Sequence, residues 1–191
     1  MIGIDLIAYN LAASSRWKEE RFKEKVLCKS EMELVQEAWD TFLKFWEFWS
    51  AKEAAFKSES QAYPKNKFHP KHYTCLPNNQ VISSISGRTL NYQTNYFPSY
   101  LTSKVTSNEC DTTSRSFEIH NPLSPSQISA AVRHEAKKEL QKHWGLELGM
   151  DQQLSYGKLD SASDKCLYLS MSHHGDYGAF AIAHKKEQAH V

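Results

Sequence analysis

Two carboxylates of the sequence stand where the surrounding pattern predicts a buried apolar side chain. Asp5 interrupts a short apolar strand predicted over Met1–Ile7, although aspartate is depleted in strands. Glu53 falls on the apolar stripe of a long predicted helix. An isolated buried carboxylate costs several kcal/mol unless a cation, a metal ion or a hydrogen-bond network balances it. We therefore expect a positive partner opposite Glu53.

Lys57 follows Glu53 by one helical turn and lies on nearly the same side of the helix. Two carboxylates and a lysine suit a hard divalent cation such as Mg²⁺, which takes oxygen ligands and keeps sites for water and substrate phosphates. Simpler interpretations stay open at this point. Asp5 alone fits a turn or capping contact at a strand end, and Glu53 fits an ion pair with Lys52 or Lys57 that has no catalytic meaning.

A further polar group, Ser170-Met171-Ser172-His173, lies in a predicted hairpin near the C-terminal end. Its two strands flank a turn at Gly175-Asp176, and the return strand is rich in small residues that let another backbone approach. Neighbouring histidines on a strand point to opposite faces, so His173 and His174 do not suit one zinc site. The preferred interpretation is a histidine that contacts a phosphate or a base. The alternative is a partly exposed hairpin histidine.

Capping and turn signals delimit the helices that must position these groups. Ser30 and Glu33 form a capping box that predicts a helix over about 31–58. Its apolar stripe consists of Trp39, Phe42, Trp46, Trp49 and Phe56. A second capping box, Ser124 to Gln127, begins an amphipathic helix that ends at Gly145. A charged segment over 17–28 is also predicted to be helical.

The middle of the chain is rich in Thr, Ser, Tyr, Val and Ile, which favours strands. The predicted strands cover about 67–75, 80–86, 89–97, 99–106 and 115–120. We therefore predict an α+β fold in which a mostly antiparallel sheet packs against the long helix and the second amphipathic helix. The chain is interpreted as a single domain over 1–191, with about 67–120 as an enlarged β-rich insertion.

Composition narrows the function classes. The 191 residues include 23 Lys+Arg and 22 Asp+Glu, a balance that argues against a general nucleic-acid binder. The four cysteines are far apart without a C-x-x-C pair, so neither a zinc ribbon nor a disulfide framework is predicted. No signal peptide and no run of about 18 apolar residues is visible, so we expect a cytoplasmic protein that does not span a membrane.

Taken together, four sequence elements resemble the 4′-phosphopantetheinyl transferase superfamily. In chain order they are Gly3-Ile4-Asp5, Arg21-Phe22-x-x-Lys25-Val26-Leu27-x-x-x-Glu31, Trp49-Ser50-x-Lys52-Glu53-Ala54-x-x-Lys57 and Ser170-Met171-Ser172-His173. The third element is specific, whereas the first and last are weak when taken alone. The position of the hairpin element resembles the holo-acyl-carrier-protein synthase type, which is built from one copy of the fold. This resemblance implies a homo-oligomer, with a trimer expected.

The reaction implied by the resemblance moves the 4′-phosphopantetheine arm of coenzyme A onto a serine of an apo acyl or peptidyl carrier protein, releasing 3′,5′-ADP. The implied metal is Mg²⁺, held by Asp5 and Glu53. Lys57 and Lys52 are expected to contact the phosphates, and Lys57 also to assist the leaving group. Glu53, or a metal-bound water that it orients, is the candidate general base for the serine hydroxyl.

The same resemblance suggests where the rest of coenzyme A lies. The nucleotide end is expected at His173, with Ser172 and Ser170, while Arg16 and Arg21 are candidates for the 3′-phosphate or for carrier-protein contacts. Two alternatives remain: a metal-dependent phosphohydrolase that uses the same carboxylates, and a non-catalytic protein that binds a carrier protein or coenzyme A.

Overall fold

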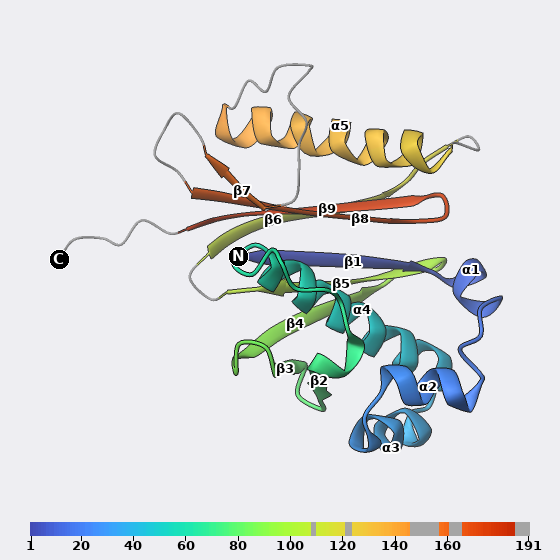
Figure 1. Ribbon diagram of the computed structural model, residues 1–191. Helices are drawn as coiled ribbons and strands as arrows, with labels where there is room; N and C mark the ends of the chain where they lie inside the picture. The colour runs from blue at the N-terminus through green and yellow to red at the C-terminus, as the bar shows by residue number, and fades with distance from the viewer. Residues whose placement is uncertain (108–109, 121–123, 146–156, 161–165, 186–191) are drawn as a thin grey trace.

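Two antiparallel β-sheets lie one above the other, and a long helix covers the outer face of each (Figure 1). The computed structural model describes residues 1–107, 110–120, 124–145, 157–160 and 166–185. The first sheet runs in spatial order through β1 (Ile2–Ala8), β5 (Tyr100–Thr106), β4 (Thr89–Tyr96), β3 (Gln80–Ser83) and β2 (Tyr73–Leu76). The second runs through β6 (Cys110–Glu118), β9 (Tyr177–Lys185), β8 (Cys166–His174) and β7 (Gly157–Asp160). Helix α4 (Thr41–Ser60) covers the first sheet and α5 (Pro125–Trp144) the second.

The predicted α+β class and the antiparallel pairing are confirmed, with the strands sorted into two sheets. The central strands are not set apart from the rest. Strand β5 pairs with β1 in the first sheet, and β6 pairs with β9 in the second. Strand β7 was not predicted. The assignment of the whole chain to a single domain stays a prediction.

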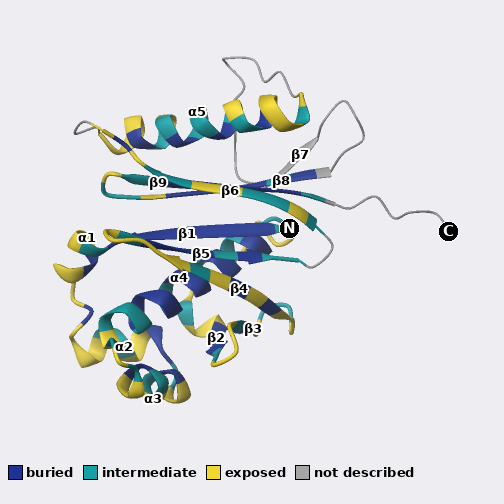
Figure 2. Ribbon diagram, turned by 180° about the vertical axis from the view of Figure 1, so that it is seen from behind, coloured by how far each residue is buried: buried dark blue, intermediate teal, exposed yellow. Residues whose placement is uncertain are grey.

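Strand β1 is buried along its whole length, as the dark blue ribbon in Figure 2 shows. Its even-numbered side chains, Ile2, Ile4 and Leu6, pack between the sheets against Ala179, Ala181 and Ala183 of β9. Because alanine side chains are small, β9 lies close to β1. The small residues of this strand predicted such a close approach. The strand that carries Asp5 is therefore held between helix α4 and the second sheet.

The helix predicted over 31–58 is wrong as one element, because the chain breaks at residues 38–40. Helix α3 (Lys29–Glu37) precedes the break and α4 follows it. Asp40 starts the second helix by accepting the N–H of Leu43 at 2.9 Å, which is a standard N-cap bond. Trp39 lies in the break with its side chain fully exposed, so the predicted apolar stripe does not begin there.

The first capping box is also displaced from its predicted position. Cys28, not Ser30, is the N-cap of α3, and its N–H donates to Glu31 at 2.8 Å. Glu31 is completely buried. The expected partner at Glu33 has no such role. Before α3, the predicted helix over 17–28 is confirmed in its middle part, as α2 (Glu20–Val26).

Helix α5 follows its prediction closely. Ser124 accepts the N–H of Gln127, Pro125 occupies the first turn, and Gly145 ends the helix with a left-handed φ of 62°. Its buried stripe packs on the second sheet, where the predicted hairpin of β8 and β9 turns at Gly175 with a φ of 58°. Within the described part of the chain, no helix combines the length and apolar character needed to cross a membrane.

Candidate active site

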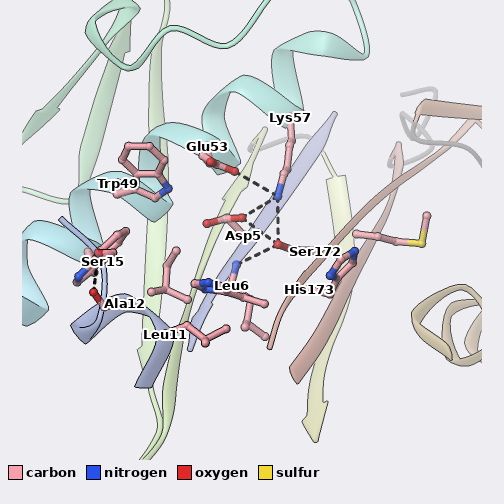
Figure 3. Close-up of a pocket in the computed structure, with 14 residues that line it drawn as sticks. Asp5, Leu6, Leu11, Ala12, Ser15, Trp49, Glu53, Lys57, Ser172 and His173 are labelled. Atoms are coloured by element: carbon pink, nitrogen blue, oxygen red, sulfur yellow. Dashed lines mark hydrogen bonds and ion pairs between the residues drawn. The ribbon is translucent and has the colours of Figure 1, made fainter. Parts of the chain in front are cut away.

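The absence of a side chain at Gly3 brings helix α4 unusually close to β1. A Cβ at this position would lie 1.8 Å from the carbonyl oxygen of Ala54, so any other residue would push the helix off the strand. Asp5 projects from the same face of β1 as residue 3, because alternate residues share a face. The close approach therefore places Asp5 beneath Glu53 and Lys57, which project from α4 (Figure 3).

Lys57 is the centre of the hydrogen bonds in this group. Its ammonium donates to Oδ1 of Asp5 at 2.7 Å, to the carbonyl oxygen of Ile4 at 3.2 Å and to Oγ of Ser172 at 3.2 Å. It also lies 3.7 Å from Oε2 of Glu53, one helical turn away. One cation thus faces two carboxylates, and the site carries an excess of negative charge when both are ionised.

The excess of negative charge affects the pKa of Glu53. Burial raises the pKa of its carboxyl, the charge of Asp5 raises it further, and Lys57 only partly opposes them, so the pKa is about 7. Glu53 is also within hydrogen-bonding reach of Asp5. On Asp5, Oδ1 is occupied by Lys57 and Ser172, whereas Oδ2 is buried without a hydrogen-bond partner.

A pocket of about 400 Å³ opens over these residues. Asp5, Glu53 and Lys57 form its polar centre, with His173 towards one end and Leu11 and Trp49 towards the other (Figure 3). The three residues predicted to form the catalytic centre are therefore brought together in a pocket. The positive partner expected opposite Glu53 is present as Lys57, but it is shared with Asp5.

The carboxylate pair fits a magnesium ion better than a transition metal. No group of three or more His, Cys, Asp or Glu side chains able to hold a metal occurs among the described residues. Mg²⁺ does not require such a set, since it is usually bound by one or two carboxylates together with water and substrate phosphates. The unpartnered Oδ2 of Asp5 and the raised pKa of Glu53 are what a site built for an additional cation would show in its absence.

His173 lines the pocket, and its contact with a ligand stays a prediction. Its side chain is exposed, and burial together with the nearby charges of Lys57 and Arg133 lowers its pKa below the ordinary value of 6.5. The imidazole is therefore neutral at pH 7, with one nitrogen as donor and the other as acceptor. Arg133 belongs to α5, so the second helix also contributes charge near this end of the pocket.

The two serines of the hairpin element are placed differently from each other. Ser170 is 1% exposed and does not line the pocket; its Oγ accepts the N–H of Ile4 at 3.0 Å. The expected contact of Ser170 with coenzyme A is therefore corrected to a contact with β1. Ser172 lines the pocket, accepts the N–H of Leu6 at 3.2 Å and donates to Asp5 at 2.9 Å. Its expected contact with coenzyme A stays a prediction.

Lys52 is likewise separated from the pocket. Its ammonium is fully buried on a different face of α4, where it donates to Glu31 at 2.7 Å and to the carbonyl oxygen of Val26 at 2.7 Å. Adjacent positions on a helix differ by about 100° in direction, so Lys52 and Glu53 cannot share a face. The predicted phosphate contact of Lys52 is therefore replaced by a structural ion pair.

The two arginines named as candidates lie outside the reaction pocket. Arg16 is exposed and pairs with Glu19 at 2.6 Å, just after α1 (Tyr9–Ala13). Arg21 lines a second pocket of about 680 Å³ between α2 and the short helix η1 (Pro70–His72), together with Lys25 and Lys71. Trp49 lines both pockets, so its ring stands between them.

Sequence reasoning missed some of the residues that shape the site. Trp49 was interpreted as core, yet it lines the pocket and hydrogen-bonds the Glu53 carboxylate, which favours its charged form. Its spacing of four residues from Glu53 was the available signal. Leu11 and Ser15 also line the pocket, and no feature of the sequence pointed to them.

The fold and the site define an α+β protein with a pocket that holds two carboxylates and one lysine. Residues 1–109, more than half of the chain, match the 4′-phosphopantetheinyl transferase superfamily, and the chain belongs to this superfamily. Among solved structures, the chain is similar to holo-[acyl-carrier-protein] synthase of Thermotoga maritima. The two share 13% identity with a TM-score of 0.39, over 70% of this chain and 89% of that one. No curated protein matches the sequence.

Proposed function

We propose that the protein transfers the 4′-phosphopantetheine group of coenzyme A to a serine of an apo acyl or peptidyl carrier protein, in a Mg²⁺-dependent reaction that releases 3′,5′-ADP. The observation that carries the proposal is the convergence of Asp5, Glu53 and Lys57 in one pocket of a chain that belongs to the superfamily. We assign it to the holo-acyl-carrier-protein synthase type, in the cytoplasm and as a homo-oligomer, with a trimer expected.

The reaction forms a bond between the serine oxygen and the phosphorus that bears the pantetheine. It breaks the bond from that phosphorus to the bridging oxygen, which leaves on 3′,5′-ADP, and the serine proton passes to a base. Negative charge increases on the phosphate oxygens as the bond breaks. A Mg²⁺ ion held by Asp5 and Glu53 would supply the compensating positive charge at the diphosphate.

Glu53 is the proposed base for the serine proton. Without a bound cation the pKa of Glu53 is about 7, so its carboxylate takes up a proton near neutral pH. A Mg²⁺ ion on the same carboxylate would lower that pKa. The Glu53 carboxylate reaches both the pocket and Asp5, so it can orient the attacking hydroxyl without leaving the site.

Lys57 is the proposed phosphate contact and stabiliser of the leaving group. Its ammonium hydrogen-bonds protein groups here, so an N–H must turn from Asp5 to the ligand when Asp5 acquires another positive partner. Lysine acts on phosphates as a mobile point charge, which suits such an exchange. His173 is proposed to contact the nucleotide end of coenzyme A from the opposite side of the pocket.

The carrier protein is proposed to dock beside the second pocket. Carrier proteins are generally acidic, and Arg21, Lys25 and Lys71 outnumber Glu24 there, next to Trp49. Arg16 is exposed and paired with Glu19, and it is kept as a candidate contact for the carrier or for the 3′-phosphate.

The release of 3′,5′-ADP tests the proposal and separates it from the alternatives. The purified protein is incubated with coenzyme A and Mg²⁺, with and without an apo carrier protein, and products are measured by chromatography. A transferase releases 3′,5′-ADP only when the carrier is present. Release without the carrier would support a phosphohydrolase. Coenzyme A that raises the melting temperature without any release would support a non-catalytic binding protein.

A further inference from the structure

Strand β1 is an edge strand whose outer edge is paired by side chains. It is bonded to β5 on one side, and on the other its outward N–H groups recur at every second residue. These N–H groups donate to Oε1 of Gln61 from Ile2 at 3.0 Å, to Oγ of Ser170 from Ile4 at 3.0 Å, to Oγ of Ser172 from Leu6 at 3.2 Å and to Nδ1 of His174 from Ala8 at 3.2 Å. Three of the four acceptors are alternate residues of β8, which we call the β8 ladder (Ser170, Ser172 and His174).

We propose that Ser172 is a positioning residue, which fixes the Asp5 carboxylate so that Oδ2 remains for the cation, whereas Ser170 only holds the strand. The inference rests on the proposed function, because it assigns Ser172 to the metal-binding geometry of the same site. It differs from the role expected from the sequence, in which both serines contact the nucleotide.

The hydroxyl of Ser172 has no freedom to turn. A serine hydroxyl has one donor and two acceptor positions. At Ser172 the two acceptor positions receive the N–H of Leu6 and the ammonium of Lys57, and the donor bonds Oδ1 of Asp5. The proton of the hydroxyl is therefore committed to Asp5, and its oxygen ties that carboxylate to both the strand and Lys57.

The hydrogen bond from Ser172 determines which oxygen of Asp5 would be available to a cation. Oδ1 accepts from Ser172 at 2.9 Å and from Lys57 at 2.7 Å, so both of its lone pairs are used. Oδ2 is buried and has no hydrogen-bond partner. Outer-shell hydrogen bonds of this kind orient a ligand and typically change metal affinity by about 10–100-fold when removed.

Ser170 provides a matched control in the same ladder. It lies two residues away, is equally buried, and accepts the N–H of Ile4 with a bond of similar length. It makes no hydrogen bond to Asp5 or Lys57. Replacing either serine by alanine leaves one buried backbone N–H without an acceptor, but only Ser172→Ala also removes a donor from Asp5.

The test compares Mg²⁺ binding by wild-type protein, Ser172→Ala and Ser170→Ala, measured by calorimetry without coenzyme A, alongside their melting temperatures. We expect both variants to melt at similarly lowered temperatures. We expect Ser172→Ala to bind Mg²⁺ about 10-fold more weakly or worse. Ser170→Ala is expected to bind within twofold of wild type. Equal Mg²⁺ affinities for the two variants would overturn the positioning role.

A second pair of variants separates loss of Mg²⁺ binding from a folding defect. Ser172→Thr and Ser172→Val have nearly the same volume and both suit a strand, but only threonine keeps the hydroxyl. The threonine variant is expected to retain most of the wild-type Mg²⁺ affinity and the valine variant to lose it. If both bind alike, the hydroxyl does not position Asp5. If the wild-type protein itself binds no Mg²⁺, the metal assignment in the proposed function is contradicted as well.

Discussion

Helix α4 carries two ionic groups on neighbouring residues, and they differ in how their charge is balanced. Lys52 and Glu31 form a one-to-one pair with both side chains completely shielded from solvent. Glu31 also accepts the N–H groups of Cys28 and Cys75, so its charge is fully hydrogen-bonded. Glu53, one residue on from Lys52, shares Lys57 with Asp5 and is partly open to a pocket.

The difference separates a structural ion pair from a site prepared for a ligand. A buried pair that is closed and balanced has no position for another charge, and it joins α2, α3, β2 and α4 through the bonds of Glu31 and Lys52. The open group has two carboxylates and one ammonium, an unpartnered carboxylate oxygen and a raised pKa. Perturbed groups of this kind in a pocket are characteristic of functional sites.

The largest effect is expected from Glu53→Gln, which keeps the size of the side chain but removes its charge. Loss of the proposed base and metal ligand should lower the transfer rate by about 10³-fold or more. The measurement is the initial rate of 3′,5′-ADP release with a carrier protein. Circular dichroism serves as the control for folding. A rate within tenfold of wild type would show that Glu53 is not the base.

Lys52→Met should act on stability instead. It leaves the Glu31 charge buried without a cation, which typically costs about 3–5 kcal/mol. Chemical denaturation measures the free energy of unfolding. The double variant Lys52→Met with Glu31→Gln should recover part of the loss because the unpaired charge is gone. If Lys52→Met were as stable as wild type but slow in transfer, the assignment of Lys52 to a structural ion pair would be wrong.

The pH dependence of stability should also distinguish the group of Asp5, Glu53 and Lys57 from the buried pair of Lys52 and Glu31. Because folding raises the pKa of Glu53 from 4.5 to about 7, the folded state holds a proton between these values that the unfolded state has released. This group therefore contributes a stability that is present below pH 4.5 and lost as the pH rises through 7. In Glu53→Gln that decline should vanish, as thermal melts across this range can show; an unaltered pH profile would contradict the raised pKa.

Mg²⁺ and the proton should compete for the same carboxylate. The affinity for Mg²⁺ should increase with pH up to about 7, and binding at pH 6 should release close to one proton. Calorimetry in two buffers of different ionisation enthalpy measures that release. No proton release at pH 6 would indicate that the ion does not bind at Glu53.

The smallest effect is expected from His173→Ala. Its imidazole is exposed at one end of the pocket. Within the described part of the chain it makes no hydrogen bond to Asp5 or Glu53. Removing it should raise KM for coenzyme A several-fold and leave kcat nearly unchanged, since uniform binding affects KM alone. Steady-state kinetics with varied coenzyme A make the comparison. An unchanged KM would remove His173 from the binding site.

Local sequence rules predicted the elements well where the local signals agreed. The α5 helix has a capping serine, an early proline and a terminal glycine that agree with one another, and its bounds follow. The prediction of one long helix was wrong because Asp40, a good N-cap residue, begins a second helix. The first helix begins after Cys28, where the buried Glu31 bonds both the N–H of Cys28 and Lys52, and not at Ser30. Such a tertiary contact cannot be predicted from spacing.

The site was predictable in its residues but less so in its roles. Asp5 and Glu53 are out of place in their local patterns, and Lys57 lies one helical turn from Glu53; this is why the three could be found. Lys52 was assigned to the wrong group because a charged residue within a helix gives no indication of whether it faces a pocket or a second buried carboxylate. Ser170 was misassigned because the outer edge of β1, where its hydroxyl accepts the N–H of Ile4, is visible only in the fold.

The mass of the carrier protein tests the central claim most directly. An apo carrier protein is incubated with coenzyme A, Mg²⁺ and either the wild-type protein or Asp5→Ala, and is then weighed by mass spectrometry. The account predicts that the carrier gains one phosphopantetheine group with the wild-type protein, that chelation of Mg²⁺ prevents the gain, and that folded Asp5→Ala does not produce it. An unmodified carrier with the wild-type protein, or full modification by Asp5→Ala, would contradict it.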